Sequence, residues 1–205
     1  PSESNEHHRK LADFKSLDTN LFDKIGVAFF SNDEDSIGVI NQLLSEIACE
    51  ITHSEHKIEF VCETLELNSK PYYLTHIRGD YIPENIKKTN NFYEINFLEF
   101  ISQFYSKGEY IIDVGANIGN HSLYFSSEIG ANVLSFEPQP HNIICLESNI
   151  YLNNLDSLVK VHRFGLGSSN GYVDIAMNRD MNFGTFSAKS DNNQFKDDYF
   201  TIEVK

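Results

Sequence analysis

The sequence contains no tryptophan and only two methionines, five prolines and three cysteines. Cys49, Cys62 and Cys145 are odd in number, lie far apart and form no Cys-x-x-Cys pair, so neither a disulfide framework nor a cysteine-based zinc site is expected. His53 and His56 have helix-end spacing but no third ligand nearby, so no metal site is predicted. This use of cysteine fits a reducing cytosol, and we therefore predict a cytoplasmic protein.

Basic residues are also scarce, because 16 Lys and Arg stand against 30 Asp and Glu and the formal net charge is −14. Such a surface repels polyanions, and no cluster of Lys and Arg offers a path for phosphates, so nucleic acid is not an expected partner. No run approaches the roughly 20 apolar residues that span a bilayer, so no membrane span is predicted. The polar start, Pro1–Lys10, lacks the apolar core of a signal peptide.

Large apolar side chains are plentiful, with sixteen Phe and ten Tyr among 205 residues. A chain of this length and composition can bury one substantial core and is not expected to be disordered. It lacks an initiating methionine and ends at Thr201–Lys205 in what reads as the middle of a strand. We therefore expect a piece of a longer chain, with an N-terminal helix and hairpin extension over residues 1–90 and the main domain over residues 91–205.

The N-terminal extension contains one clear amphipathic pattern, from Ile37 to Ile51, which follows possible N-cap residues at 31–35. Two short stretches rich in β-branched and aromatic residues are separated by Asn68-Ser69-Lys70, which indicates a hairpin. A second helical stripe ends at Lys107-Gly108. The predicted elements are a helix over 37–51, strands over 57–62 and 71–77, and a helix over 91–105.

After Gly108 the pattern becomes strand, glycine turn, helix, strand, helix, strand, which is typical of a parallel α/β sheet. The first strand, Tyr110–Val114, is an apolar run of the kind buried on both faces of a sheet. Gly130 is expected to take the left-handed conformation at the end of a helix. The predicted elements are helices over 119–129 and 138–153 and strands over 132–136, 158–163, 172–177 and 199–204, the last two around a polar loop over 178–198.

The most informative residues join the first of these strands to the following helix. Small residues in such a turn let the backbone approach a ligand, and the start of the helix offers free N–H groups, as in nucleotide sites. The dinucleotide pattern Gly-x-Gly-x-x-Gly would require glycines at Asn117 and Asn120. Asp113 would repel a pyrophosphate but suits the amino group and sulfonium of S-adenosylmethionine. The run is Asp113, Val114, Gly115, Ala116, Asn117, Ile118, Gly119, Asn120 and His121.

Glu137 lies at the end of the next strand, eighteen residues after Gly119, in the sequence Phe136-Glu137-Pro138. A carboxylate at this place in doubly wound folds can accept hydrogen bonds from both ribose hydroxyls of an adenosine cofactor. The glycine turn and the acid together indicate an adenosine site more strongly than either does alone.

These motifs, with Gly165-Leu166-Gly167 and the preceding Phe92-Tyr93-Glu94, resemble the FkbM-type methyltransferases over about residues 80–205. The resemblance implies a class I methyltransferase, with a Rossmann-like, doubly wound, mainly parallel sheet, S-adenosylmethionine as methyl donor and a hydroxyl acceptor on a sugar or natural product. Family members continue into a further strand with an Asp-x-Glu-Gly-type motif. This chain stops before that motif, so the C-terminal strands and part of the site are expected to be missing.

By matched position, the resemblance places Asp113, Gly115, Asn117 and Gly119 at the methionine and the turn, and Glu137 at the ribose. Other interpretations remain open, since Asp113 could cap a helix, Glu137 could be a solvated turn residue, Glu94 could lie on a solvated helix face, and His121 could pack beside the sheet. No catalytic residue is identified. The candidate cofactor-binding residues are Glu94, Asp113, Gly115, Ala116, Asn117, Gly119, Asn120, His121, Glu137 and Pro138.

Three functions are compatible with this sequence. The first is methyl transfer from S-adenosylmethionine to a hydroxyl of a sugar, glycan or small metabolite. The second is an NAD-dependent sugar-modifying enzyme, which Asp113 and Asn117 disfavour. The third is a catalytically silent α/β domain that binds a ligand or a partner. The oligomeric state is not indicated.

Overall fold

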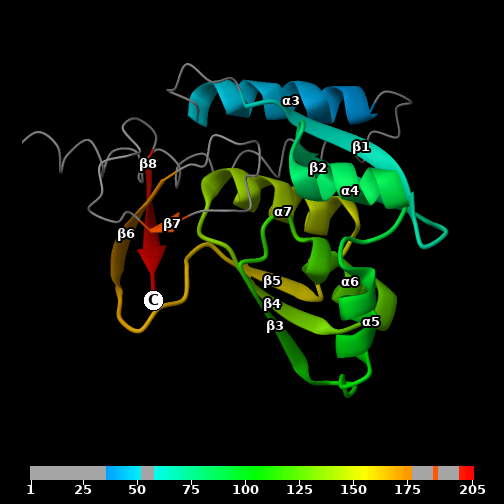
Figure 1. Cartoon of the computed structure of the whole chain (residues 1–205). Coiled ribbons are helices and arrows are strands. Elements are labelled where there is room, and N and C mark those ends of the chain that lie inside the picture. Colours follow the sequence, from blue (N-terminus) through cyan, green and yellow to red (C-terminus); the bar gives the residue numbers. More distant parts are fainter. Residues whose placement is uncertain (1–35, 52–57, 177–186, 189–198) are drawn as a thin grey trace, which may run out of the picture. The chain divides into compact units, whose positions relative to one another are not determined.

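The computed structural model describes residues 36–51, 58–176, 187–188 and 199–205 (Figure 1). The chain forms two compact units, residues 1–62 and residues 63–205. The polar start Pro1–Lys10, the possible N-cap residues at 31–35, Met177 and most of the polar loop over 178–198 fall outside the described residues. The division into domains at residue 90 remains a prediction. No helix in the described ranges combines the length and apolar character needed to cross a bilayer.

In the first unit, helix α3 spans Ser36–Ile51 and confirms the predicted amphipathic helix. Ile40, Leu44 and Ile47 are buried and follow one another at intervals of four and three residues, the spacing of one helix face. The side chain of Asn41 accepts a hydrogen bond from the N–H of Cys62 at 2.6 Å and donates one to its carbonyl at 3.1 Å. This amide therefore joins α3 to the strand that begins at Phe60.

Strands β1 (Phe60–Leu67) and β2 (Lys70–Ile77) form the predicted hairpin. Asn68 and Ser69 connect them with φ angles of 49° and 62°, and two such left-handed residues are typical of a type I′ turn. The predicted bounds 57–62 were wrong for the first strand. Its second half alternates polar residues with apolar ones, so the apolar run stops before the strand does.

The helix predicted over 91–105 is present in a shorter form as helix α5, Ile95–Ser102. A further helix, α4, precedes it and spans Tyr81–Thr89. The prediction missed α4, whose N-cap Asp80 accepts a hydrogen bond from the N–H of Tyr81 at 2.8 Å. Asn90 and Glu94 have φ angles of 49° and 60°, and left-handed residues interrupt a right-handed helix.

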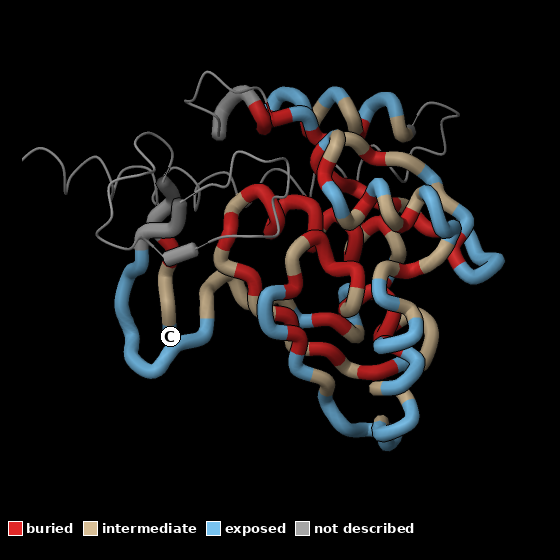
Figure 2. Tube along the Cα trace, viewed as in Figure 1, coloured by how far each residue is buried: buried red, intermediate tan, exposed pale blue. Residues whose placement is uncertain are grey.

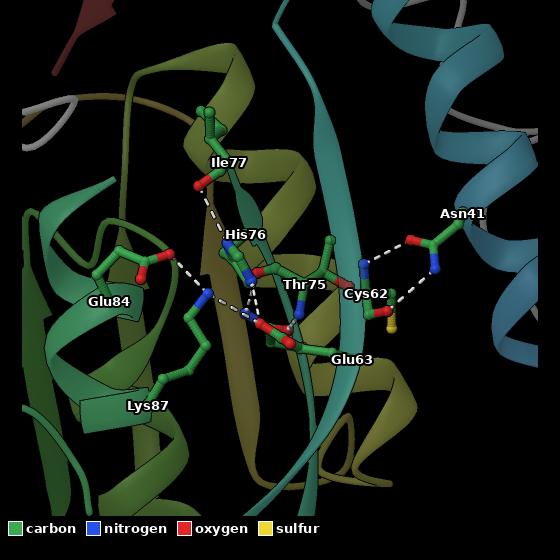
Figure 3. A network of polar contacts seen from close by, with 9 residues as sticks. Asn41, Cys62, Glu63, Thr75, His76, Ile77, Glu84 and Lys87 are labelled. Carbon is green, nitrogen blue, oxygen red and sulfur yellow. Dashed lines mark hydrogen bonds and ion pairs between the residues drawn. The ribbon is translucent and has the colours of Figure 1, made fainter. Parts of the chain in front are cut away.

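A charged network joins the hairpin to α4 (Figure 3). The buried His76 ring contacts the Glu63 carboxylate through Nε2 at 2.6 Å and the carbonyl of Ile77 through Nδ1 at 3.0 Å. Lys87 of α4 contacts Glu63 at 3.3 Å and Glu84 at 2.6 Å. Burial alone would raise the pKa of Glu63, but the hydrogen bond from His76 and the charge of Lys87 hold that pKa below its ordinary value.

The main sheet contains three parallel strands in the order β3-β4-β5, which confirms the predicted parallel α/β pattern. Helix α6 connects β3 to β4 and ends at Gly130, whose φ of 66° confirms the predicted left-handed C-cap. Helix α7 connects β4 to β5 and is buried along most of its length (Figure 2). The bounds are β3 Tyr110–Val114, α6 Asn120–Ile129, β4 Asn132–Phe136, α7 Pro140–Leu152 and β5 Val159–His162.

Helix α6 covers the face of the sheet that contains Asp113 and Ser135. On the opposite face of β3, Tyr110, Ile112 and Val114 are 64%, 60% and 60% exposed. The prediction that β3 is buried on both faces was therefore wrong for the described residues. The apolar sequence of β3 is that of a doubly covered strand, but the described elements cover it on one side.

Three further strands form an antiparallel sheet in the order β7-β6-β8. Strands β6 (Gly171–Ala176) and β8 (Tyr199–Val204) agree with the two predicted strands, and β7 (Ser187–Ala188) is a short addition. Before this sheet, Arg163 contacts both carboxylate oxygens of Glu147 at 2.6 and 2.7 Å, which joins the end of β5 to α7. A bidentate pair of this kind fixes orientation as well as distance.

Replacing Glu63 by Gln should lower the free energy of unfolding by roughly 0.5–1 kcal/mol at pH 7, because the pair with His76 and Lys87 is partly exposed to solvent. The folded pKa of Glu63 is below its ordinary value of 4.5, so its contribution is present above that pH and is lost as the pH falls through the folded pKa. Urea unfolding at pH 7 and pH 3 should show a smaller difference between the two proteins at pH 3. Glu66→Gln, an exposed change on the same strand, is the control. A difference that persists unchanged at pH 3 would contradict this account.

Candidate functional site

The turn between β3 and α6 is closely fitted to the end of β4. Gly115, Asn117 and Gly119 have φ angles of 76°, 52° and 89°. The N–H groups of Gly115 and Ala116 both donate to the carbonyl of Phe136, at 2.8 and 3.1 Å. Left-handed residues reverse the chain within a few positions, so the turn brings the end of β3 back against the neighbouring strand.

The two glycines of the turn serve different purposes. A Cβ on Gly119 would lie 2.6 Å from Cδ1 of Leu146, so this glycine lets the turn approach α7. A Cβ on Gly115 would meet no atom within 4 Å, so the backbone there faces open space. Gly119 is also the N-cap of α6 and has no side chain with which to cap it, which leaves N–H groups of the first turn for other acceptors. Gly115 is therefore the point where a ligand can approach the main chain.

Glu137 is 5% exposed and connects the turn to α7. One carboxylate oxygen accepts a hydrogen bond from the N–H of Asn117 at 2.8 Å, and the other accepts from the N–H of Gln139 at 2.9 Å and from the Asn142 amide at 3.5 Å. Burial raises the pKa of Glu137, these donors oppose the rise, and the charge of Asp113 adds to it. Glu137 is thus a buried acid with defined partners, and the interpretation as a solvated turn residue is wrong.

Asp113 lies on the inner face of β3 and is 8% exposed. One of its carboxylate oxygens accepts a hydrogen bond from the Ser122 hydroxyl at 2.6 Å, and that hydroxyl lies 2.7 Å from the hydroxyl of Ser135. The chain of polar groups runs from β4 through α6 to the end of β3. The structure therefore directs part of the Asp113 carboxylate toward α6, beside the turn.

Glu94 and His121 lie together at the outer side of the turn. Glu94 approaches Nε2 of His121 at 3.3 Å, and the two side chains are 48% and 29% exposed. Glu94 precedes α5 in the left-handed conformation, so its predicted place on a helix face is wrong. The Asn120 amide accepts from the N–H of Tyr93 and donates to its carbonyl, both at 3.0 Å. Glu94 is a non-glycine residue in the left-handed conformation, and such residues are often found at functional sites.

Two further candidates, Ala116 and Pro138, pack against neighbouring segments of the site. Ala116 is buried, and Pro138 lies close to Gly165, where a Cβ would be 3.7 Å from the proline ring. The segment after β5 therefore packs against the end of β4. Of the ten predicted residues, the structure brings Asn117 to Glu137 and His121 to Glu94, and it places Asp113 close enough to Glu137 to affect its pKa.

Several polar residues of this region were missed from the sequence: Ser122, Ser135, Gln139 and Asn142. All four are at most 5% exposed, and a polar residue within an apolar strand or helix face was the signal that could have found them. Within the described residues, both polar atoms of the Gln139 amide and Oδ1 of Asn142 have no hydrogen-bond partner. Buried polar groups normally have a partner, so these three atoms are exceptions among the described residues.

The arrangement suits a ligand that bears positive charge. Two buried acids and the partly exposed Glu94 make the region negative, and the open space at Gly115 gives access to the main chain. The described residues contain no group of three His, Cys, Asp or Glu side chains suited to hold a metal ion.

This chain is similar to a curated protein over part of its length and, more distantly, to a solved structure. No family model matches the chain. Methyltransferase sdnD of Sordaria araneosa is 35% identical over 115 residues, which are 55% of this chain and 41% of that protein. A candidate transferase of Pyrococcus horikoshii has a TM-score of 0.37 and 15% identity, covering 64% of this chain and 49% of the other. The chain thus covers about two fifths of the length of the curated relative.

Replacing Asn117 should separate the contribution of its side-chain hydrogen bond from the cost of its left-handed backbone conformation. Its Oδ1 accepts a hydrogen bond from the N–H of Ile118 at 2.6 Å, and its φ is 52°. Asn117→Ala loses the bond and retains an unfavourable conformation, whereas Asn117→Gly loses the bond alone. We expect the alanine variant to be about 1 kcal/mol less stable than the glycine variant in urea unfolding. Equal stabilities would show that the left-handed conformation is not maintained in solution.

Proposed function

We propose that this chain forms the S-adenosylmethionine-binding part of a methyltransferase. The observation that supports this most directly is the pair of buried acids, Asp113 and Glu137, at the ends of adjacent parallel strands beside an open glycine turn. Nucleoside cofactors bind at the carboxyl ends of such strands. The partial similarity to a protein named as a methyltransferase and the resemblance to the FkbM-type family agree with this proposal.

Charge favours this cofactor over a dinucleotide. S-Adenosylmethionine has a sulfonium and an amino group, and the acids of the site attract both. A pyrophosphate would bring negative charge to the same turn, and α6 with its uncapped N–H groups would have to outweigh Asp113 and Glu137. We therefore assign the amino-acid end of the cofactor to the neighbourhood of Gly115 and the first turn of α6.

Glu137 would hold the ribose. Each carboxylate oxygen has two acceptor sites. The oxygen bonded to the N–H of Asn117 has one site left for a ribose hydroxyl, and on the other oxygen, bonded to the N–H of Gln139, the second hydroxyl would take the place of the long 3.5 Å bond from Asn142. Because the turn and the start of α7 already fix the carboxylate, little side-chain entropy would be lost when the ribose binds.

S-Adenosylmethionine, when bound, supplies an activated methyl group that an acceptor oxygen can take by in-line displacement. The residues of this chain would then position the donor and exclude water, and no described side chain is identified as the general base. We propose a hydroxyl of a sugar, glycan or small metabolite as the acceptor, since the acidic chain disfavours large anions.

We also propose that β3, β4 and β5 form one half of a doubly wound, Rossmann-like sheet. Their order and parallel direction fit such a half. The exposed apolar side chains of β3 are those that further elements cover in a sheet of this kind.

Calorimetric titration with S-adenosylhomocysteine and with NAD tests the cofactor assignment. We expect the purified protein to bind S-adenosylhomocysteine and not NAD. Gly115→Ala should weaken this binding by about tenfold or more, because the methyl group enters the space left for the ligand. Gly130→Ala is a matched control, since Gly130 also has a positive φ and open space at its Cβ position but lies at the opposite end of α6.

The two glycine variants should lose similar stability, so their difference in affinity reports on the turn. Binding of NAD alone would favour the dinucleotide enzyme. Failure to bind either ligand would leave a silent domain or a different ligand as the better interpretation and would overturn the methyltransferase proposal.

A further inference from the structure

Helix α7 binds the edge of strand β2 through two asparagine side chains. Asn149 accepts a hydrogen bond from the N–H of Thr75 at 2.5 Å and donates to the carbonyl of Thr75 at 2.9 Å. Asn153 accepts from the N–H of Tyr73 at 3.0 Å and donates to its carbonyl at 2.8 Å. Each amide thus satisfies both backbone groups of one strand residue, as a neighbouring strand would do. Helix α7 and strand β2 lie side by side (Figure 1).

The spacing of the two elements makes this possible. Residues 149 and 153 are one helical turn apart, and four residues of helix rise roughly 6 Å. Residues 73 and 75 point their backbone groups to the same edge of β2, and two residues of strand advance roughly 6.6 Å. The two amides therefore bind alternate residues of the strand, Tyr73 and Thr75. Thr75 is next to His76, which belongs to the network with Glu63 and Lys87 (Figure 3).

The two asparagines differ in their third hydrogen bond. The Asn149 amide also donates to the carbonyl of Ile118, at 2.8 Å, in the middle of the glycine turn. The Asn153 amide donates instead to the carbonyl of Asn149, at 2.7 Å, within its own helix. Asn149 is fully buried and uses both amide protons and its oxygen. It alone of the pair joins the hairpin to the turn.

The bond to Ile118 acts on the peptide group that precedes Gly119. The carbonyl of Ile118 and the N–H of Gly119 belong to one planar group, and that N–H donates to the carbonyl of Ala116 at 2.8 Å. A glycine on one side leaves such a group free to rotate, because positive and negative φ are nearly equal in energy for glycine. With Asn149 on the carbonyl and Ala116 on the N–H, both ends of the peptide are fixed.

We infer that Asn149 is a positioning residue for the cofactor: it locks the Ile118–Gly119 peptide and thereby aims the turn and the first N–H groups of α6 at the ligand. The inference rests on the proposed cofactor function. It also makes the β1–β2 hairpin part of the binding machinery, because the amide that holds Thr75 is the amide that holds the turn.

The test compares Asn149→Ala with Asn153→Ala. Each variant loses one buried or half-buried amide, two hydrogen bonds to β2 and one to a further carbonyl. Thermal unfolding measures the loss of stability, and calorimetric titration with S-adenosylhomocysteine at a temperature where both variants are folded measures affinity. We expect Asn149→Ala to bind about tenfold more weakly than wild type and Asn153→Ala to stay within about threefold.

Equal affinities of the two variants, with wild type binding normally, would overturn the role of Asn149 and leave the cofactor proposal intact. Absence of binding by wild type would overturn both. If Asn149→Ala does not fold, hydrogen exchange of the wild-type protein decides the question. The N–H of Thr75 donates to Asn149, and the N–H of Tyr73 donates to Asn153. S-Adenosylhomocysteine should then slow hydrogen exchange of the Thr75 N–H more than that of the Tyr73 N–H. An equal effect on the two would contradict the inference.

Discussion

The buried carboxylate of Glu137 is the interaction on which the architecture of the site depends. It accepts hydrogen bonds from N–H groups of the glycine turn and of the start of α7. One side chain therefore fixes the two segments that follow β3 and β4. A charged group at 5% exposure is unfavourable unless it is well bonded, and both segments must stay in place to bond it. Removing the carboxylate would leave the N–H groups of Asn117 and Gln139 without this partner.

The same principle recurs around the turn, where side-chain amides and hydroxyls replace backbone partners. Asn120 satisfies both backbone groups of Tyr93, and Asn149 does so for Thr75. The hydroxyl of Ser122 donates a hydrogen bond to the side-chain carboxylate of Asp113. These bonds explain why α6 and α7 contain buried polar residues that weaken their apolar pattern. The residues that shape the site are therefore also the ones that fasten the helices and the hairpin together.

The sequence was sufficient for the parts of the fold that local chemistry determines. The strand, turn and helix around Gly115, the left-handed Gly130 and the bounds of β4 could all be predicted. The late start of α5 could not, because Glu94 takes a left-handed conformation next to Tyr93, whose backbone Asn120 holds from a distant part of the sequence. The partners of the acids were equally hidden, since each is contributed by an element whose position only the folded chain defines.

The positions of the glycines alone would not distinguish a site for S-adenosylmethionine from a site for a dinucleotide. The charges of Asp113 and Glu137 provide a further distinction. At a separation of roughly 8 Å and an effective dielectric constant of about 20, two unit charges interact by about 2 kcal/mol, which is roughly a thirtyfold change in affinity. Asp113 and Glu137 lie close enough that the charge of one raises the pKa of the other, so a ligand at this turn meets a field from both. A cation relieves their mutual repulsion, whereas a pyrophosphate adds to it. The acids that organise the turn would thus also select the charge of the ligand.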